Sequence, residues 1–314
     1  MAVNISKIKG LVEKRHRDTM QIFSGSSNQP LAKKIAKDTR SVFGAVDLSR
    51  FTNGEARVFV QERRVSEKVV VVQSLSLPTD EHLIEYMLLC DALARMGASD
   101  ITAVIPWMGY SLQDKVFRKG ESLSAKVIAQ ILQASKAKRI IALDLHNRAI
   151  LGFFDMPVID LSARSLFVKY FRPSINKKTY VVAPDAGAVK SSTSFAMDLG
   201  VGVVYMDKKR NLTTGKVDVI GMSRSVRGND VIIIDDMIST GSTLIEITKV
   251  LKKEGARSIR VAVTHHLHVP GAQEKLDKSP IDMLVTTDTI VNKNKSPKMS
   301  ILSVADLIGE ELKS

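Results

Sequence analysis

Short apolar runs rich in β-branched residues recur along the chain and alternate with segments of helical spacing. The strand-like runs are Met20 to Phe23, Val69 to Val72, Ile101 to Ile105, Arg139 to Leu143, Tyr180 to Ala183, Val201 to Tyr205, Val231 to Ile234 and Ile259 to Val263. Helices are predicted from near Thr79 to Gly97, from Ser124 to about Ser135, and from Thr243 to Glu254. This alternation indicates an α/β fold with mostly parallel sheets flanked by helices.

The strands and helices fall into two successive sets. The split lies near Leu161 to Phe171, shortly before a loop at residues 172–176. We therefore predict a basic N-terminal extension over residues 1–18, an N-terminal α/β domain over 19–163 and a C-terminal α/β domain over 164–299. The composition of the extension fits either a basic helix or a frayed arm.

Composition narrows the class of protein. Apolar residues make up 44% of the 314 residues and charged residues 25%, as in globular proteins with a substantial core. No apolar run approaches the ~18 residues of a membrane span, and the N-terminus lacks the apolar centre of a signal peptide, so a cytoplasmic location is expected. The single cysteine, Cys90, excludes an internal disulfide, and its apolar helical surroundings predict a buried, inert thiol.

The net charge of +13 would suit a nucleic-acid-binding protein or an enzyme with polyanionic small substrates. Lysine and arginine are spread along the chain, aromatic residues are only 5%, and no zinc-finger spacing is present. These features favour small anionic substrates over nucleic acid.

The segment from Val231 to Leu244 carries the most specific chemistry. Four β-branched residues form a strand buried on both faces, Asp235 and Asp236 stand at its carboxyl end, and Gly241 opens the next helix. Adjacent carboxylates repel one another and need an external partner, while helix N-terminal N–H groups and nearby hydroxyls suit a phosphate. The segment therefore predicts a site for a ribose phosphate. The residues assigned to this site are Asp235, Asp236, Ser239, Thr240, Gly241, Ser242 and Thr243.

This segment resembles the phosphoribosyl diphosphate (PRPP) loop of type I phosphoribosyltransferases and of PRPP synthetases, and alone it does not separate the two. Several further blocks, in order beyond the first 18 or so residues, resemble the PRPP synthetase (ribose-phosphate diphosphokinase) family. The resemblance implies two phosphoribosyltransferase-like domains, with residues 300–314 returning to the N-terminal one. It also implies transfer of the diphosphoryl group of ATP to the anomeric hydroxyl of ribose 5-phosphate, giving PRPP and AMP with Mg²⁺.

Two blocks resemble the ATP-binding elements of that family. Phe51-Thr52-Asn53-Gly54-Glu55 is similar to a segment that holds the adenine of ATP bound at a neighbouring subunit, with Asn53 in place of the usual aspartate. Gln113, Asp114 and Lys115 match a second block, in which Leu112 replaces an ATP-contacting arginine. The resemblance thus implies a homo-oligomer with an ATP site shared between subunits. The ATP-binding residues are then Phe51, Asn53, Glu55, Gln113, Asp114 and Lys115.

The remaining blocks imply the metal and the catalytic groups. His146, in Asp-Leu-His after a strand, and the distant Asp185 match residues that contact Mg²⁺, and Lys208 and Arg210 match cations of a mobile catalytic loop that closes over the triphosphate. For the denser cluster His265, His266 and His268 we expect a loop or surface role rather than zinc binding.

Two alternatives remain open beside the synthetase. Leu112 and Asn53 would suit a catalytically impaired regulatory homologue that binds synthetase subunits. A phosphoribosyltransferase that uses PRPP would explain the Val231 to Leu244 segment but leaves the N-terminal domain without a role.

Overall fold

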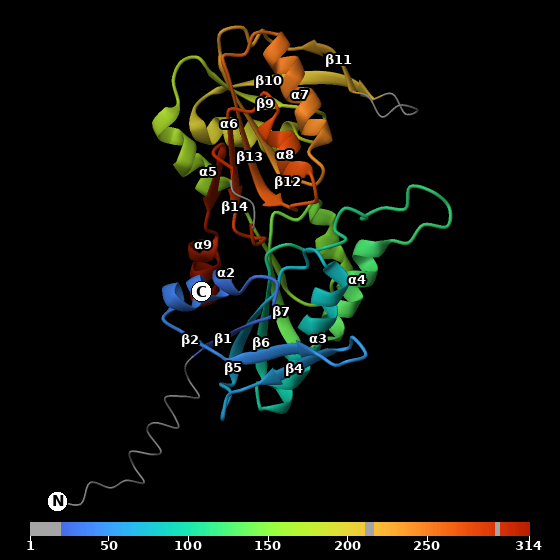
Figure 1. Cartoon of the computed structure of the whole chain (residues 1–314). Coiled ribbons are helices and arrows are strands. Elements are labelled where there is room, and N and C mark those ends of the chain that lie inside the picture. Colours follow the sequence, from blue (N-terminus) through green and yellow to red (C-terminus); the bar gives the residue numbers. More distant parts are fainter. Residues whose placement is uncertain (1–19, 211–216, 293–295) are drawn as a thin grey trace, which may run out of the picture. The chain divides into compact units, whose positions relative to one another are not determined.

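The computed structural model describes residues 20–210, 217–292 and 296–314 (Figure 1), with the side chains of 208–210 and 217–220 excluded. The predicted basic extension, residues 1–18, lies outside the described residues. The chain forms two compact units. The first comprises the described part of Met1–Leu161 with Thr289–Val291 and Val304–Ser314, and the second comprises that of Ser162–Asp288 and Asn292–Ser303.

The first unit is built on a parallel sheet whose strands lie in the order β2-β1-β5-β6-β7-β8. The strands are β1 (Gln21–Ser24), β2 (Val42–Phe43), β5 (Lys68–Val72), β6 (Asp100–Ile105), β7 (Ala137–Leu143) and β8 (Val158–Leu161). A separate antiparallel hairpin is formed by β3 (Val46–Arg50) and β4 (Ala56–Val60). The helical segments are α2 (Gln29–Thr39), α3 (Thr79–Arg95), α4 (Ser124–Ala134), the 3₁₀ turn η1 (Arg148–Phe153) and α9 (Ala305–Lys313).

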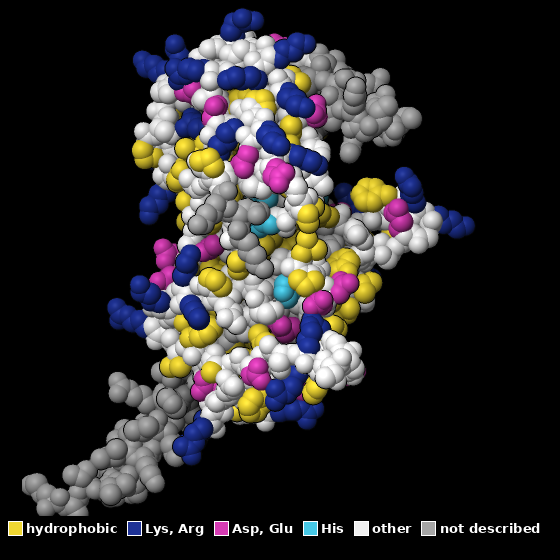
Figure 2. Space-filling model, in the orientation of Figure 1, with side chains coloured by type: hydrophobic (Ala, Val, Ile, Leu, Met, Phe, Trp, Pro, Cys, Tyr) yellow, Lys and Arg dark blue, Asp and Glu magenta, His cyan; other side chains and the backbone are white. Residues whose placement is uncertain are grey.

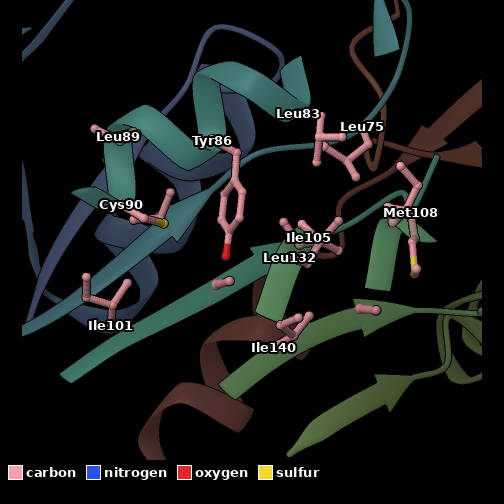
Figure 3. Close-up of a cluster of buried hydrophobic side chains, with 14 of the residues drawn as sticks. Leu75, Leu83, Tyr86, Leu89, Cys90, Ile101, Ile105, Met108, Leu132 and Ile140 are labelled. Atoms are coloured by element: carbon pink, nitrogen blue, oxygen red, sulfur yellow. The ribbon is translucent and has the colours of Figure 1, made fainter. Parts of the chain in front are cut away.

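The core of the first unit follows from the alternation of side chains along its strands. Val69 and Val71 of β5 point to the same face, where they join buried side chains of α3 and α4 such as Tyr86 and Leu132 (Figure 3). Cys90 of α3 is buried in this cluster, and burial raises the pKa of its thiol to about 12. The prediction of a buried cysteine is confirmed.

The second unit has a mixed sheet in the order β11-β10-β9-β12-β13-β14-β15, in which β10 and β11 are antiparallel and the other neighbours parallel. The strands are β9 (Thr179–Ala183), β10 (Gly202–Arg210), β11 (Val217–Met222), β12 (Asp230–Ile238), β13 (Ser258–His266), β14 (Met283–Thr287) and β15 (Met299–Leu302). The helical segments are α5 (Arg164–Phe171), the 3₁₀ turn η2 (Arg172–Ser174), α6 (Val189–Leu199), α7 (Ser242–Lys253) and α8 (Ala272–Asp277).

Helices cover both faces of this second sheet (Figure 1). Val231 and Ile233 pack with α7 and α8, whereas Ile232 and Ile234 pack with α5 and α6, as the two-residue period of a strand requires. A strand buried on both faces has no polar positions, which explains the unbroken apolar run seen in the sequence. The predicted α/β fold with mostly parallel sheets flanked by helices is confirmed.

Three features differ from the sequence-based expectation. Strand β12 continues to Ile238, four residues beyond its predicted end, so that Asp235 and Asp236 lie inside the strand. Residues 304–314 belong to the first unit, whereas residues 300–303, which were predicted to join it, belong to the second unit, where β15 pairs with β14. The pattern also missed several elements, namely β2, β3, β4, β8, β11, β14, β15, α2, α5, α6, α8 and α9.

Candidate functional site

The acidic pair lies on the last part of β12 in the second unit. Asp235 pairs with Val263 of β13 in parallel register, and its Oδ1 accepts the N–H of Asp236 at 2.9 Å. The Asp235 side chain is exposed and that of Asp236 is partly exposed, so both carboxylates are accessible to a ligand. They lie at the carboxyl end of a parallel sheet, where ligands bind in open α/β folds.

The pKa of Asp235 is shifted by its surroundings. Partial desolvation by the surrounding protein and then the negative charge of Asp236 raise its pKa well above the usual range, and Asp185 adds to the shift. The carboxyl groups of Asp185, Asp235 and Asp236 therefore interact at one edge of the sheet, a position that favours cations and hydrogen-bond donors.

The predicted phosphate loop connects β12 to α7. Gly241 is buried with φ of 74°, and a Cβ there would lie 3.1 Å from Leu276 Cδ2, so only glycine fits without strain. Around it the side chains of Thr240, Ser242 and Thr243 are exposed, and the hydroxyls of Thr240 and Ser242 lie 3.1 Å apart. The loop thus presents hydroxyl groups beside the N-terminus of a twelve-residue helix, as phosphate binding requires.

Lys208 and Arg210 occupy the end of β10. Their backbones pair with Val219 and Val217 of β11, so this segment is a strand rather than the start of a loop. The side chains of both residues lie outside the described part of the chain, as do residues 211–216 completely. Their catalytic assignment stays a prediction.

In the first unit, the predicted adenine-contacting segment forms the turn of the β3–β4 hairpin. The N–H of Glu55 donates to Asn53 Oδ1 at 3.2 Å, and the N–H of Phe51 donates to the carbonyl of Glu55 at 2.9 Å. Asparagine therefore keeps the acceptor oxygen that an aspartate would offer to the turn. Phe51, Asn53 and Glu55 are all exposed, with 52% of Phe51 accessible, so they are available to a ligand or a second subunit.

The segment after β6 carries the second predicted nucleotide-binding block. Gln113 is anchored by the hydroxyl of Ser124, which donates to its Oε1, and Lys115 is exposed. Asp114 Oδ2 accepts Asn147 Nδ2 at 2.6 Å. Leu112 is half-buried and offers no group that binds phosphate. The structure thus joins Asp114 to the neighbouring turn that follows β7.

His146 lies exposed on that turn, which runs from Asp144 to Asn147. Asp144 has φ of 37°, an uncommon value for a residue other than glycine. Asn147 caps η1, because its Oδ1 accepts the N–H of Ala149 at 3.0 Å, and Asp160 Oδ1 accepts the N–H of Leu145 at 3.0 Å. Sequence reasoning missed Asn147 and Asp160. The only sequence feature that could have indicated Asn147 is its position directly after the Asp-Leu-His block. No sequence feature indicated Asp160.

The histidine cluster differs from the expectation. His265 and His266 are buried on β13, so the predicted loop or surface role was wrong for both. The rings of His266 and His268 stack with centroids 4.1 Å apart, and burial lowers the pKa of both, that of His268 to about 4. These rings pack as neutral side chains within the second unit.

Among the described residues, no group of three or more His, Cys, Asp or Glu side chains is arranged to hold a metal ion, and no helix has the length and apolar character needed to cross a membrane. On the face drawn in Figure 2, lysine and arginine side chains are scattered among acidic and apolar ones. The excess of positive charge is not gathered into one patch on that face.

Comparisons with known proteins cover nearly the whole chain. Residues 20–135 match the model for the N-terminal domain of ribose phosphate pyrophosphokinase, and residues 154–300 match the phosphoribosyl transferase domain. The chain is 36% identical over 293 residues to the ribose-phosphate pyrophosphokinase of Wolinella succinogenes, covering 93% of this chain and 94% of that protein. Identity to the Thermotoga maritima protein of the same name is 34% over 296 residues, with the same coverage of both chains.

A solved structure is also similar to this chain over nearly its whole length. Phosphoribosylpyrophosphate synthetase from Mycobacterium smegmatis superposes with a TM-score of 0.85 at 31% sequence identity. The match covers 94% of this chain and 98% of that one, so both units have counterparts in it.

Proposed function

The chain belongs to the ribose-phosphate pyrophosphokinase family, and we propose that its second unit binds ribose 5-phosphate while its first unit contacts the nucleotide. Enzymes of this family transfer the diphosphoryl group of ATP to the anomeric hydroxyl of ribose 5-phosphate. The chain is accordingly an enzyme of PRPP synthesis, with AMP as the second product.

The accessible acidic pair and hydroxyl loop at the end of β12 are the observation that carries the proposal. Asp235 and Asp236 accept hydrogen bonds from the ribose hydroxyls, which relieves the accumulation of acceptors on that edge. Ser239 to Thr243 hold the 5-phosphate with hydroxyls and with the N–H groups that begin α7.

The nucleotide is bound by the two segments of the first unit that resemble ATP-binding elements. Gln113, Asp114 and Lys115 contact ATP in one subunit, and Phe51, Asn53 and Glu55 contact the adenine of ATP bound by another subunit. The exposed hairpin supports this division, because an aromatic side chain that is 52% accessible at a turn has contact area left for a partner. This use of two subunits requires a homo-oligomer, and a cytoplasmic location is part of the same proposal.

Lys208 and Arg210 act during transfer. Diphosphoryl transfer needs positioning and charge stabilisation more than covalent help from the protein. They neutralise charge on the transferring diphosphoryl group.

The residues present fit Mg²⁺. Mg²⁺ prefers oxygen ligands and is commonly held by one or two carboxylates together with substrate phosphates, so a three-residue cage is not required. Asp185, Asp235 and Asp236 are close enough on the second unit for their charges to interact, and a bound cation would favour their ionised forms. His146 and Asp185 would hold it, and their pairing around one ion stays a prediction. When bound, Mg²⁺ neutralises charge on the phosphate oxygens of ATP.

The direct test supplies purified protein with ribose 5-phosphate, ATP and Mg²⁺ and follows PRPP and AMP by chromatography. Both products are expected in equal amounts. Absence of both, over a range of Mg²⁺ and phosphate concentrations, would overturn the proposal and favour the regulatory homologue.

Leu112 provides a sharper test of the nucleotide half. Leu112→Arg restores one charge-assisted contact of about 1.5 to 3 kcal/mol, so the KM for ATP is expected to fall about tenfold or more. The KM for ribose 5-phosphate should not change. An unchanged KM for ATP would mean that the side chain at position 112 does not face the triphosphate.

A further inference from the structure

Two adjacent strand ends in the first unit fix the shape of the turn that bears His146. Strands β7 and β8 are parallel neighbours, with Leu143 opposite Leu161. Just beyond β7, the N–H of Asp144 donates to the carbonyl of Leu161 at 2.8 Å. The next N–H, that of Leu145, donates to the side chain of Asp160 at 3.0 Å. The turn is thus tied to β8 by two consecutive amides.

These ties coincide with a strained backbone. Asp144, at φ of 37°, adopts a left-handed conformation that is uncommon for residues other than glycine, and the two hydrogen bonds hold it there. The amide of Asp144 and the following amide both end on β8, so the restraint acts on both sides of the strained torsions. Loss of the hydrogen bond from Leu145 to Asp160 would leave only the hydrogen bond from Asp144 to tie the turn to β8.

The ionised side chain of Asp160 does not by itself stabilise the fold, because it is buried. Its side chain is only 8% exposed, and burial, with the nearby charge of Asp144, raises its pKa to about 6. The compensating cation, Arg148, has a side chain that is 80% exposed and lies 3.8 Å away, so it contributes little. A buried carboxylate with so weak a counter-ion is kept for the hydrogen bond it accepts.

The same turn reaches the second nucleotide-binding block. Asn147, one residue after His146, donates from Nδ2 to Asp114 at 2.6 Å while its Oδ1 caps η1. A turn that shifts would therefore move His146 and Asp114 together.

From this geometry we propose that Asp160 is a positioning residue for the nucleotide half of the reaction. It accepts the N–H of Leu145, holds the turn from Asp144 to Asn147 in its strained form, and so orients His146 and, through Asn147, Asp114. The proposal rests on the proposed function for its kinetic consequence, but the ordering of the turn can be measured without catalysis.

The test compares Asp160→Ala with Asp160→Asn, which keeps an acceptor oxygen for Leu145. Asp282→Ala is the matched control, because Asp282 Oδ2 likewise accepts a backbone N–H, that of Ile259, at 2.8 Å in the second unit. The full-length protein is used throughout. The readouts are kcat, the KM for each substrate, the Mg²⁺ concentration at half-maximal rate, and hydrogen exchange of the peptide spanning residues 144–150 by mass spectrometry.

Asp160→Ala is expected to raise the KM for ATP or the half-maximal Mg²⁺ concentration about 10- to 100-fold, as loss of a contact that orients a ligand residue does. The KM for ribose 5-phosphate should stay within threefold, and exchange at residues 144–150 should accelerate. Asp160→Asn should behave like the unaltered protein in all of these. Adding Asp160→Ala to His146→Ala should lower the rate little further, because both changes act through one group.

Two results would overturn the proposal. One is an Asp160→Ala variant whose kinetics match those of Asp282→Ala, since the contact would then be merely structural. The other is unchanged exchange at residues 144–150. If the unaltered protein makes no PRPP, the proposed function fails separately, while faster exchange in Asp160→Ala would still show that Asp160 orders the turn.

Discussion

The two units share one strand order but differ in the polar side chains at the ends of their strands. In the first, the order β2-β1-β5-β6-β7-β8 places the first strand beside the edge and the later ones in sequence, and β10-β9-β12-β13-β14-β15 repeats it in the second. Each unit also has a further antiparallel element, which is the β3–β4 hairpin after β2 in the first unit and strand β11 after β10 in the second. The equivalent of β12 is therefore β5.

The ends of these two strands differ in how their polar groups are used. After β5, Gln73 Oε1 accepts the hydroxyl of Ser27 at 2.7 Å, its Nε2 donates to Glu85 at 2.7 Å, and both Gln73 and Ser74 are buried. On β12, Asp235 and the hydroxyls that follow it are exposed. Topology creates the same edge twice, but only side chains whose hydrogen-bonding groups face solvent can make it a binding site.

The largest effect is expected from the acidic pair. Changing Asp235→Asn together with Asp236→Asn should lower kcat/KM for ribose 5-phosphate about 10²- to 10⁴-fold, because each charge-assisted hydrogen bond contributes about 1.5 to 3 kcal/mol. Asp198→Asn, at an exposed ion pair with Arg164, is the control and should have little effect. If the double variant retained full kcat/KM, the contrast between β12 and β5 would have no functional meaning.

The next effect concerns the antiparallel elements. Lys208→Ala on β10 should lower kcat about 10²- to 10³-fold, with a smaller change in KM for ribose 5-phosphate, because its cation acts on charge in the transition state. Arg57→Ala on the β3–β4 hairpin removes an exposed ion pair with Asp47 and should leave kcat nearly unchanged. Equal losses of kcat in the Lys208→Ala and Arg57→Ala variants would mean that the antiparallel elements of the two units do not differ in their catalytic role.

A third test compares two glycines of the second unit. Gly241→Ala should raise the KM for ribose 5-phosphate at least tenfold and lower the free energy of unfolding by about 1 to 3 kcal/mol, since φ is 74° and Leu276 is close. Gly228→Ala has a similar φ of 70° with no neighbour within 4 Å, so it should lower stability by about 1 to 2 kcal/mol without affecting KM. Equal KM values would show that the loop does not hold the phosphate.

The smallest effect is on the pH dependence of stability. Burial, more than the nearby Asp144, raises the pKa of Asp160 to about 6, so its ionisation should lower the free energy of unfolding as pH rises from about 4 to 6. Hydrogen bonding from Arg257 holds the pKa of Asp230 well below its usual range, so its stabilisation is present above about pH 4 and is lost as pH falls through the folded pKa.

These opposite slopes can be separated by substitution. At pH 7, Asp160→Asn should raise the free energy of unfolding of the first unit by about 1 to 3 kcal/mol, and Asp230→Asn should lower that of the second by a similar amount. Thermal unfolding between about pH 2 and 7, with hydrogen exchange reported for each unit, measures both. A rise in the stability of the first unit with pH between 4 and 6 would contradict the sign expected for Asp160.

The sequence by itself determined the two-part α/β architecture and the segment of acids and hydroxyls that follows a buried strand. Val231 to Ile234 had to be a strand buried on both faces, and Asp235 to Thr243 had to present acids and hydroxyls near a helix start, because local periodicity and local chemistry carry both signals. Strands such as β15 and the end of β12 were missed or shortened, since their polar residues are held by neighbouring strands rather than by their own pattern.

Only the tertiary structure decided which polar side chains serve the fold and which remain available to ligands. Gln73 and Asp235 are both polar residues at strand ends, yet one is enclosed by Ser27 and Glu85 and the other is exposed. Asp160 reaches Leu145 across 15 residues of sequence because β7 and β8 are parallel neighbours. Contacts of this kind depend on strand pairing between distant segments, for which no local pattern in the sequence carries a signal.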